Sequence, residues 1–132
     1  MTKTDHLEPS PPIYGLQPGF SQGKRAVKGQ NYESEVLALA LADGKVKKPT
    51  LWNRLILGNK GYYEVYLVFM SNDGYQDYHW YRRDRNGLWS HKPGSTHARN
   101  TDYSNNIIVN PAKADCGRYT RGGILLWVRK RR

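Results

Sequence analysis

The chain has 132 residues, a formal net charge of +10 and a single cysteine, Cys116. This length supports one small domain with one core, and a lone cysteine excludes both an internal disulfide and a Cys-X-X-Cys metal or redox site. The positive charge attracts anionic partners such as nucleic acid, acidic polysaccharide or protein, anionic lipid or a mineral face. No apolar run reaches the roughly 20 residues that span a membrane, and no signal peptide is visible.

Residues 1–30 are rich in proline and glycine and contain few aliphatic residues. This composition sustains neither the helix period nor the strand period, so we predict a flexible, disordered N-terminal arm. Residues 31–128 should form a single α+β domain, and residues 129–132 a basic tail.

One segment near the start of this domain has the pattern of a helix. Asn31 is a favourable N-cap, residues 36–42 are strong helix formers, and Gly44 is placed to end the helix. The apolar residues cover nearly every side, so we expect burial on more than one side. A basic linker follows, and residues 51–57 predict a second, short helix.

Two segments predict long strands joined by a turn. From Gly61 to Met70, side chains alternate with a period of two, and after Asn72-Asp73-Gly74 the chain returns along residues 75–83. Asn86-Gly87 favours a type I′ turn, with positive φ at both central residues, before a third strand over residues 88–92. One face of the first strand should carry Tyr63, Val65, Leu67 and Phe69.

The remaining chain predicts two more short strands. Residues 94–106 have the composition of a loop, residues 107–109 predict a strand that Pro111 stops, and residues 123–128 predict the last strand. The expected fold class is α+β, with an antiparallel β-meander and one buried helix packed on it.

Basic and aromatic residues are interleaved around the predicted hairpin and at the C-terminus. Cations contact anionic groups and rings can stack on a ligand, so this pattern predicts a polyanion-binding surface with an aromatic platform. It also suits single-stranded nucleic acid, although no RNP, KH or zinc-finger pattern is present. The predicted polyanion-binding residues are Arg82, Arg83, Arg85, Lys92, Arg129, Lys130, Arg131 and Arg132. The predicted platform consists of Tyr78, Trp80, Trp89 and Trp127.

Histidine and cysteine raise the alternatives of a metal site and a hydrolase. His79, His91 and His97 lack the spacing of a local metal-ligand motif, so we predict no metal or cofactor and interpret them as ordinary sheet and loop histidines. Cys116 could be a nucleophile beside a histidine, but no helix N-terminus is predicted there to lower its pKa.

About a third of the chain, from Asp77 to Tyr119, carries a specific pattern. It includes Tyr78-His79-Trp80-Tyr81-Arg82, Asn86-Gly87 and Trp89-Ser90-His91-Lys92-Pro93-Gly94. By these residues the chain resembles the insoluble matrix shell proteins of bivalve molluscs, a small family with bacterial relatives.

The resemblance has a consequence for the hydrolase alternative. Members of the family carry an Asn-Cys-Tyr stretch where the helix begins, which with the histidine of the His-Trp-Tyr-Arg strand suits a papain-like Cys-His pair. Here Asn31-Tyr32-Glu33 stands in that place, so the nucleophile is missing and His79 is a candidate member of a relict dyad.

The resemblance and the charge together predict a secreted, non-enzymatic structural or binding protein of a calcified extracellular shell matrix. Its expected partners are an anionic matrix polysaccharide, an acidic protein or calcium carbonate. No cluster of Asp and Glu could supply the six to eight oxygens that calcium prefers. A relict or active papain-like Cys-His hydrolase and a nucleic-acid-binding domain are the alternatives.

Overall fold

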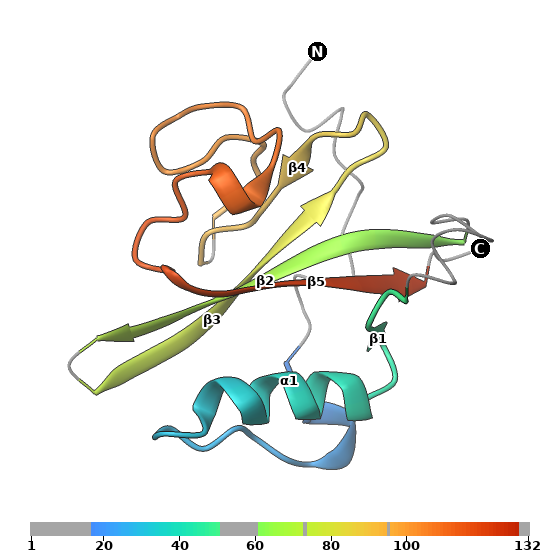
Figure 1. Ribbon diagram of the computed structural model, residues 1–132, viewed down its shortest axis with the longest axis vertical. Coiled ribbons are helices and arrows are strands. Elements are labelled where there is room, and N and C mark those ends of the chain that lie inside the picture. Colours follow the sequence, from blue (N-terminus) through green and yellow to red (C-terminus); the bar gives the residue numbers. More distant parts are fainter. Residues whose placement is uncertain (1–16, 51–60, 73, 95, 130–132) are drawn as a thin grey trace.

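The computed structural model describes residues 17–50, 61–72, 74–94 and 96–129. A five-stranded antiparallel sheet, in the order β1-β5-β2-β3-β4, has a helix on one face and a long loop on the other (Figure 1). The predicted α+β class is therefore confirmed. The elements are η3 (Phe20–Gln22), α1 (Tyr32–Ala42), β1 (Val46–Lys47), β2 (Tyr62–Asn72), β3 (Tyr75–Arg83), β4 (Trp89–Ser90), η4 (Pro111–Lys113) and β5 (Arg121–Arg129).

The second helix predicted over residues 51–57 lies outside the described residues, as do residues 1–16 of the predicted arm and residues 130–132 of the predicted tail. Within the part of the chain that the structure describes, no helix is long and apolar enough to cross a membrane.

The last strand enters the middle of the sheet instead of extending the meander. β5 pairs with β2 on one side and with β1 on the other, while β2, β3 and β4 follow one another as predicted. The predicted strand over residues 107–109 is wrong, because only isolated bridges form there, Trp89 with Ile108 and Thr101 with Ile107. Ile107 is 50% exposed and Val109 is 71% exposed, so only Ile108 of this segment contributes to the core.

The third strand is shorter than predicted. β4 ends at Ser90, and the next residue, His91, forms a single bridge with Arg99. Pro93 and Gly94 turn the chain back at this point, so the backbone of His91 pairs within the loop and does not extend along β3.

The β3–β4 turn is also different from the prediction. Only Gly87 has positive φ (86°), whereas Asn86 does not, so a two-residue type I′ turn is wrong. The Asp84 amide donates to the Leu88 carbonyl (2.7 Å) and the Gly87 amide donates to the Asp84 carbonyl (2.9 Å). These bonds close a three-residue loop, the next most common hairpin connection, in which glycine takes the left-handed position.

Substituting Gly87 by valine should lower the free energy of unfolding by more than about 1 kcal/mol, because a β-branched residue is strained at positive φ. A Cβ here would meet only the Arg83 guanidinium, at 3.9 Å, so the cost comes from the backbone. Urea unfolding measures it. Gly87→Asn is the matched control, since asparagine tolerates this conformation, and equal losses for both variants would contradict the backbone explanation.

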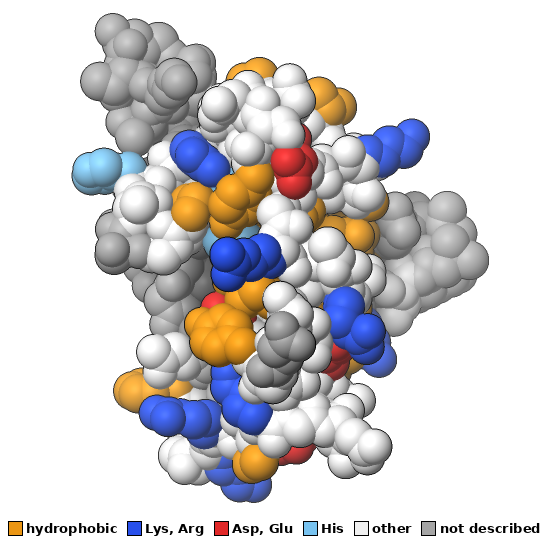
Figure 2. Space-filling view, turned by 90° about the vertical axis from the view of Figure 1, so that its left-hand side faces the viewer, with side chains coloured by type: hydrophobic (Ala, Val, Ile, Leu, Met, Phe, Trp, Pro, Cys, Tyr) orange, Lys and Arg blue, Asp and Glu red, His pale blue; other side chains and the backbone are white. Residues whose placement is uncertain are grey.

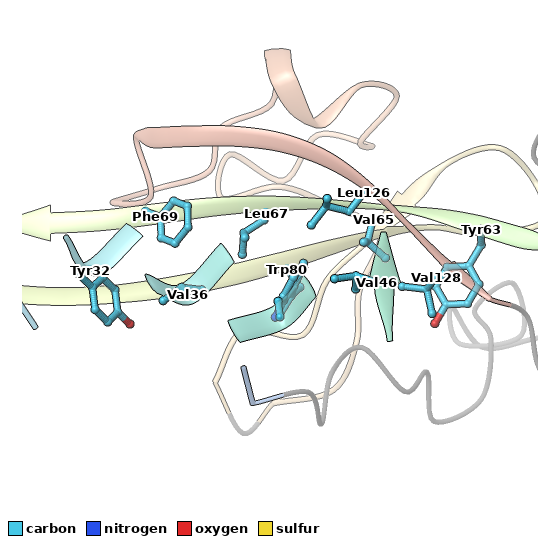
Figure 3. Packing of buried hydrophobic residues seen from close by; sticks show 11 residues of the cluster. Tyr32, Val36, Val46, Tyr63, Val65, Leu67, Phe69, Trp80, Leu126 and Val128 are labelled. Atoms are coloured by element: carbon cyan, nitrogen blue, oxygen red, sulfur yellow. The ribbon is translucent and has the colours of Figure 1, made fainter. Parts of the chain in front are cut away.

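The main core lies between the sheet and α1 (Figure 3). The fully buried residues of α1, Tyr32, Val36 and Ala40, form one stripe at a spacing of four, and the leucines beside them are half-buried. They pack on one face of β2, and the predicted grouping of residues on this face is confirmed. That face carries Tyr63, Val65, Leu67 and Phe69.

A smaller core lies between the opposite face of the sheet and the loop that joins β4 to β5. It contains Val68, Tyr81, Trp89 and Ile108, with Cys116 packed against them. Because β3 alternates, Trp80 faces α1 while its neighbours His79 and Tyr81 face this loop. The sheet is therefore covered on both faces.

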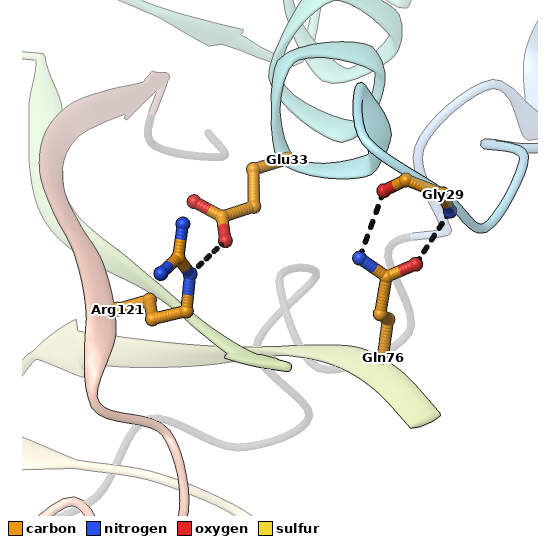
Figure 4. A network of polar contacts seen from close by, with 4 residues as sticks. All are labelled: Gly29, Glu33, Gln76 and Arg121. Carbon is orange, nitrogen blue, oxygen red and sulfur yellow. Dashed lines mark hydrogen bonds and ion pairs between the residues drawn. The ribbon is translucent and has the colours of Figure 1, made fainter. Parts of the chain in front are cut away.

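Residues 17–30, which we assigned to the flexible arm, make specific contacts with the domain. The Gly19 amide donates to Asp43 Oδ2 (2.7 Å) at the end of α1. The Gly29 amide and carbonyl both bond the side-chain amide of Gln76 on β3, close to the ion pair of Glu33 with Arg121 (Figure 4). These bonds hold the described part of the arm against both the helix and the sheet.

Candidate functional site

The registers of the sheet bring basic segments that are distant in sequence to one end of the sheet. Val46 lies opposite Val128, so residues 45–48, which include three lysines, run beside the end of β5. Arg129 in turn lies opposite Tyr62, the first residue of β2. β3 ends at the same place, because it runs antiparallel to β2.

These residues share the sheet face that points away from α1. Lys47 Nζ lies 4.2 Å from the centre of the Tyr62 ring, and Arg129 Cζ lies 6.0 Å from it. Arg83 pairs with Glu64, two residues along β2, at 2.7 Å. We call the group Lys47, Tyr62, Arg83 and Arg129 the basic end. Within this group, the contacts of the Tyr62 phenol with Lys47 and Arg129 lower its pKa, as expected beside two cations.

The predicted polyanion-binding residues are distributed unequally. Arg83 and Arg129 belong to the basic end, and the exposed Arg85 follows β3 in the adjacent turn, whereas the exposed Lys92 lies beyond β4. Arg82 is only 6% exposed and lies 4.0 Å from Asp84, so its side chain is not offered to a polymer. Lys130, Arg131 and Arg132 lie outside the described residues.

The four rings of the predicted aromatic platform do not meet on one exposed surface. Trp80 (5% exposed) and the half-buried Tyr78 face α1, whereas Trp89 (6% exposed) faces the loop. Trp127 is 2% exposed and stacks on Tyr62, with ring centres 5.5 Å apart. Its partner in that stack, Tyr62, is half-buried and is a residue that the sequence pattern did not single out.

The half-buried His79 and the fully buried His91 form a pair under the loop. His79 Nε2 and His91 Nδ1 are 2.8 Å apart, and His91 Nε2 lies 2.8 Å from the Thr101 carbonyl. A carbonyl only accepts, so His91 Nε2 donates to it, and His91 Nδ1 then accepts from His79 Nε2. Burial lowers the pKa of both histidines well below the ordinary value, so both rings are neutral at pH 7.

The structure does not assemble a Cys-His nucleophile. The Cys116 thiol donates to the Pro111 carbonyl (3.6 Å), and burial raises its pKa. Tyr32, at the position where the resemblance implies a cysteine, packs under the opposite face of the sheet from His79. A cysteine placed there would be separated from His79 by the sheet itself.

Among the described residues, no group of three or more His, Cys, Asp or Glu side chains could hold a metal ion.

A comparison with curated proteins finds 38% identity over 106 residues to "Insoluble matrix shell protein 1" of Ruditapes philippinarum. The matched residues are 79% of this chain, and the chain spans 63% of the length of that relative. No family model and no solved structure matches the chain. The identity confirms the resemblance predicted from the Trp89-Ser90-His91-Lys92-Pro93-Gly94 block: the chain is a relative of the insoluble matrix shell proteins of bivalve molluscs.

Proposed function

We propose that the chain is a non-enzymatic binding protein of an extracellular, calcified shell matrix, and that its basic end holds an anionic matrix polymer. The name of its relative supports the matrix role. The observation that carries the binding role is the convergence of Lys47 and Arg129 on the half-buried ring of Tyr62. A polymer bearing carboxylate or sulfate groups would contact both cations along one end of the sheet.

The acidic residues are too few to compensate the positive charge of the chain, because 21 Lys and Arg stand against 11 Asp and Glu. With a net charge of +10, the field around the chain favours polyanions of several kinds. An acidic polysaccharide, an acidic protein and the carbonate face of calcium carbonate are the partners that fit an extracellular matrix.

The test measures binding to alginate, heparin, polyaspartate and calcium carbonate powder over a series of salt concentrations. We expect tight binding at low salt that weakens steeply as salt rises. The double variant Lys47→Gln/Arg129→Gln should bind at least about tenfold more weakly, with a shallower salt dependence. The matched control is Lys24→Gln/Lys113→Gln, which removes two exposed lysines elsewhere.

The outcomes separate local from general electrostatics. If the control variant loses as much affinity as the basic-end variant, the effect comes from net charge alone. Absence of binding to all four materials at low salt would overturn the proposal. An oligonucleotide serves as a comparison, because an affinity well above that for heparin would favour a nucleic-acid-binding domain.

A further inference from the structure

A half-open groove of about 420 Å³ lies between the β2–β3 hairpin and the loop before β5. Its volume falls within the range of small-molecule pockets, which is about 300–1,000 Å³. On the side of the molecule shown in Figure 2, hydrophobic side chains gather beside Lys or Arg and Asp or Glu side chains. The lining of the groove includes Tyr75, Asp77, Tyr103, Gly117, Arg118 and Tyr119.

Two of the groove's tyrosines present ring surface to solvent. Tyr75 is 60% exposed and Tyr103 is 40% exposed, although both belong to an ordered part of the fold. Tyr103 lies close over the backbone of Gly117, where a Cβ would come within 3.2 Å of its ring. Glycine at this position therefore sets how near the ring approaches the loop.

The third tyrosine is fixed by the buried histidine pair. The Tyr119 ring stacks on His79 with ring centres 5.0 Å apart, and its hydroxyl donates to Asp77 Oδ2 (2.9 Å). His79 is itself held by His91. The groove is thus formed before any ligand enters, which reduces the entropy lost on binding.

The charges of the groove limit the kind of ligand that it would accept. Asp77 and Arg118 both line it, so the lining carries one charge of each sign. Lys28 Nζ lies 5.5 Å from the centre of the Tyr75 ring and Arg99 Cζ lies 5.4 Å from that of Tyr103, so cations also lie beside both rings. A carboxylate has about four acceptor positions, of which Asp77 uses two for the Tyr78 amide and the Tyr119 hydroxyl, and a guanidinium has five N–H donors. Both groups therefore keep positions for hydroxyl groups. Exposed tyrosine rings offer flat apolar surface for the C–H face of a ring.

We infer that this groove binds an uncharged saccharide ring within a glycan chain. Tyr75 and Tyr103 contact the apolar faces of the sugar, and Asp77 and Arg118 bond its hydroxyl groups. This site is separate from the basic end and does not depend on it. One chain would then join an uncharged glycan to an anionic polymer.

Isothermal titration calorimetry with the full chain tests this inference, using uncharged hexamers of β-linked glucose and of β-linked N-acetylglucosamine. At least one hexamer should bind, with an affinity that changes little between low and high salt. Tyr75→Ala and Tyr103→Ala should each weaken binding by about three- to tenfold through loss of one ring contact. Gly117→Ala should also weaken it, because the added methyl group displaces the Tyr103 ring.

The control Phe20→Ala removes an aromatic ring that is 74% exposed and lies outside the groove, and it should leave the affinity unchanged. The Lys47→Gln/Arg129→Gln variant should keep glycan binding, so the two sites fail independently. No heat with either hexamer, or unchanged affinity in both tyrosine variants, would overturn the inference. Self-association that Tyr103→Ala abolishes, without glycan binding, would instead assign the groove to a second copy of the chain.

Discussion

Replacing Asp102 by alanine should lower the free energy of unfolding by about 3 kcal/mol or more. Its side chain is nearly buried, and it organises the loop between β4 and β5. Oδ1 accepts from the amides of Ser104 (2.8 Å) and Asn106 (3.0 Å), and Oδ2 accepts from the amide of Asp115 (3.0 Å). Alanine would leave these three donors without their partner, and each such loss costs about 1 kcal/mol or more.

Urea unfolding at neutral pH, followed by aromatic fluorescence, measures this loss. Asp102→Asn is the matched control, since it keeps the shape and one acceptor oxygen, so its loss should lie between those of the parent and the alanine variant. The same bonds lower the pKa of Asp102, most strongly the one from the Asp115 amide. An alanine variant as stable as the parent would show that other contacts hold the loop.

Acidification should destabilise the chain well above the pH at which its carboxylates protonate. The pKa of His79 and His91 is lower in the folded state than the ordinary value of about 6.5 because both rings are buried. Below about pH 6.5 both histidines bind protons in the unfolded chain but stay neutral in the folded protein. The free energy of unfolding is therefore highest above this pH and decreases as the pH falls below it. Between about pH 7 and pH 5 we expect a loss of roughly 2–4 kcal/mol.

Urea unfolding across this pH range measures the loss, and NMR of the imidazole nitrogens assigns it. Both rings should remain neutral in the folded protein at pH 5, with the proton on Nε2 in each. Asp43, Asp102 and Asp115 have lowered pKa values, so their contribution to the free energy of unfolding changes only at more acidic pH. The loss between pH 7 and pH 5 therefore reports on the histidines. Constant stability over this range, with ordinary titration of both rings, would contradict the assigned neutral pair.

Local periodicity predicted the elements that depend on neighbouring residues. The alternation from Gly61 to Met70 correctly grouped the residues that share each face of β2, and the helix begins and ends within a residue of its predicted limits. These features follow from where side chains point along a strand or helix, which the sequence specifies directly.

Features that depend on distant contacts were not predictable in the same way. The place of β5 between β1 and β2 depends on pairing between residues about 50 to 80 positions apart in the chain, and no turn residue indicates it. The loop after β3 was misassigned for a related reason. Asn-Gly is compatible with more than one hairpin loop, and the bond from the Asp84 amide to the Leu88 carbonyl, which sets its length, is not visible in the dipeptide.

The candidate site shows a similar division. Composition predicted binding of anions, but it treated Arg82 and Arg83 alike. The alternation that places Trp80 in the core also places Arg82 on the core side and Arg83 on the other, so the sequence contained the distinction. By contrast, the approach of Lys47 to Arg129, and of Tyr103 to Tyr119, requires the sheet register and the path of the loop.

The central position of β5 also dictates the order in which the chain matures during synthesis. β2 remains without one of its two partners until Arg121–Arg129 has emerged from the ribosome, and β1 has no strand to pair with before then. Until then, the backbone N–H and C=O groups along one edge of β2 have no strand partner. The complete sheet therefore requires contacts of long sequence separation, which slow folding and leave that edge open to aggregation until β5 has paired.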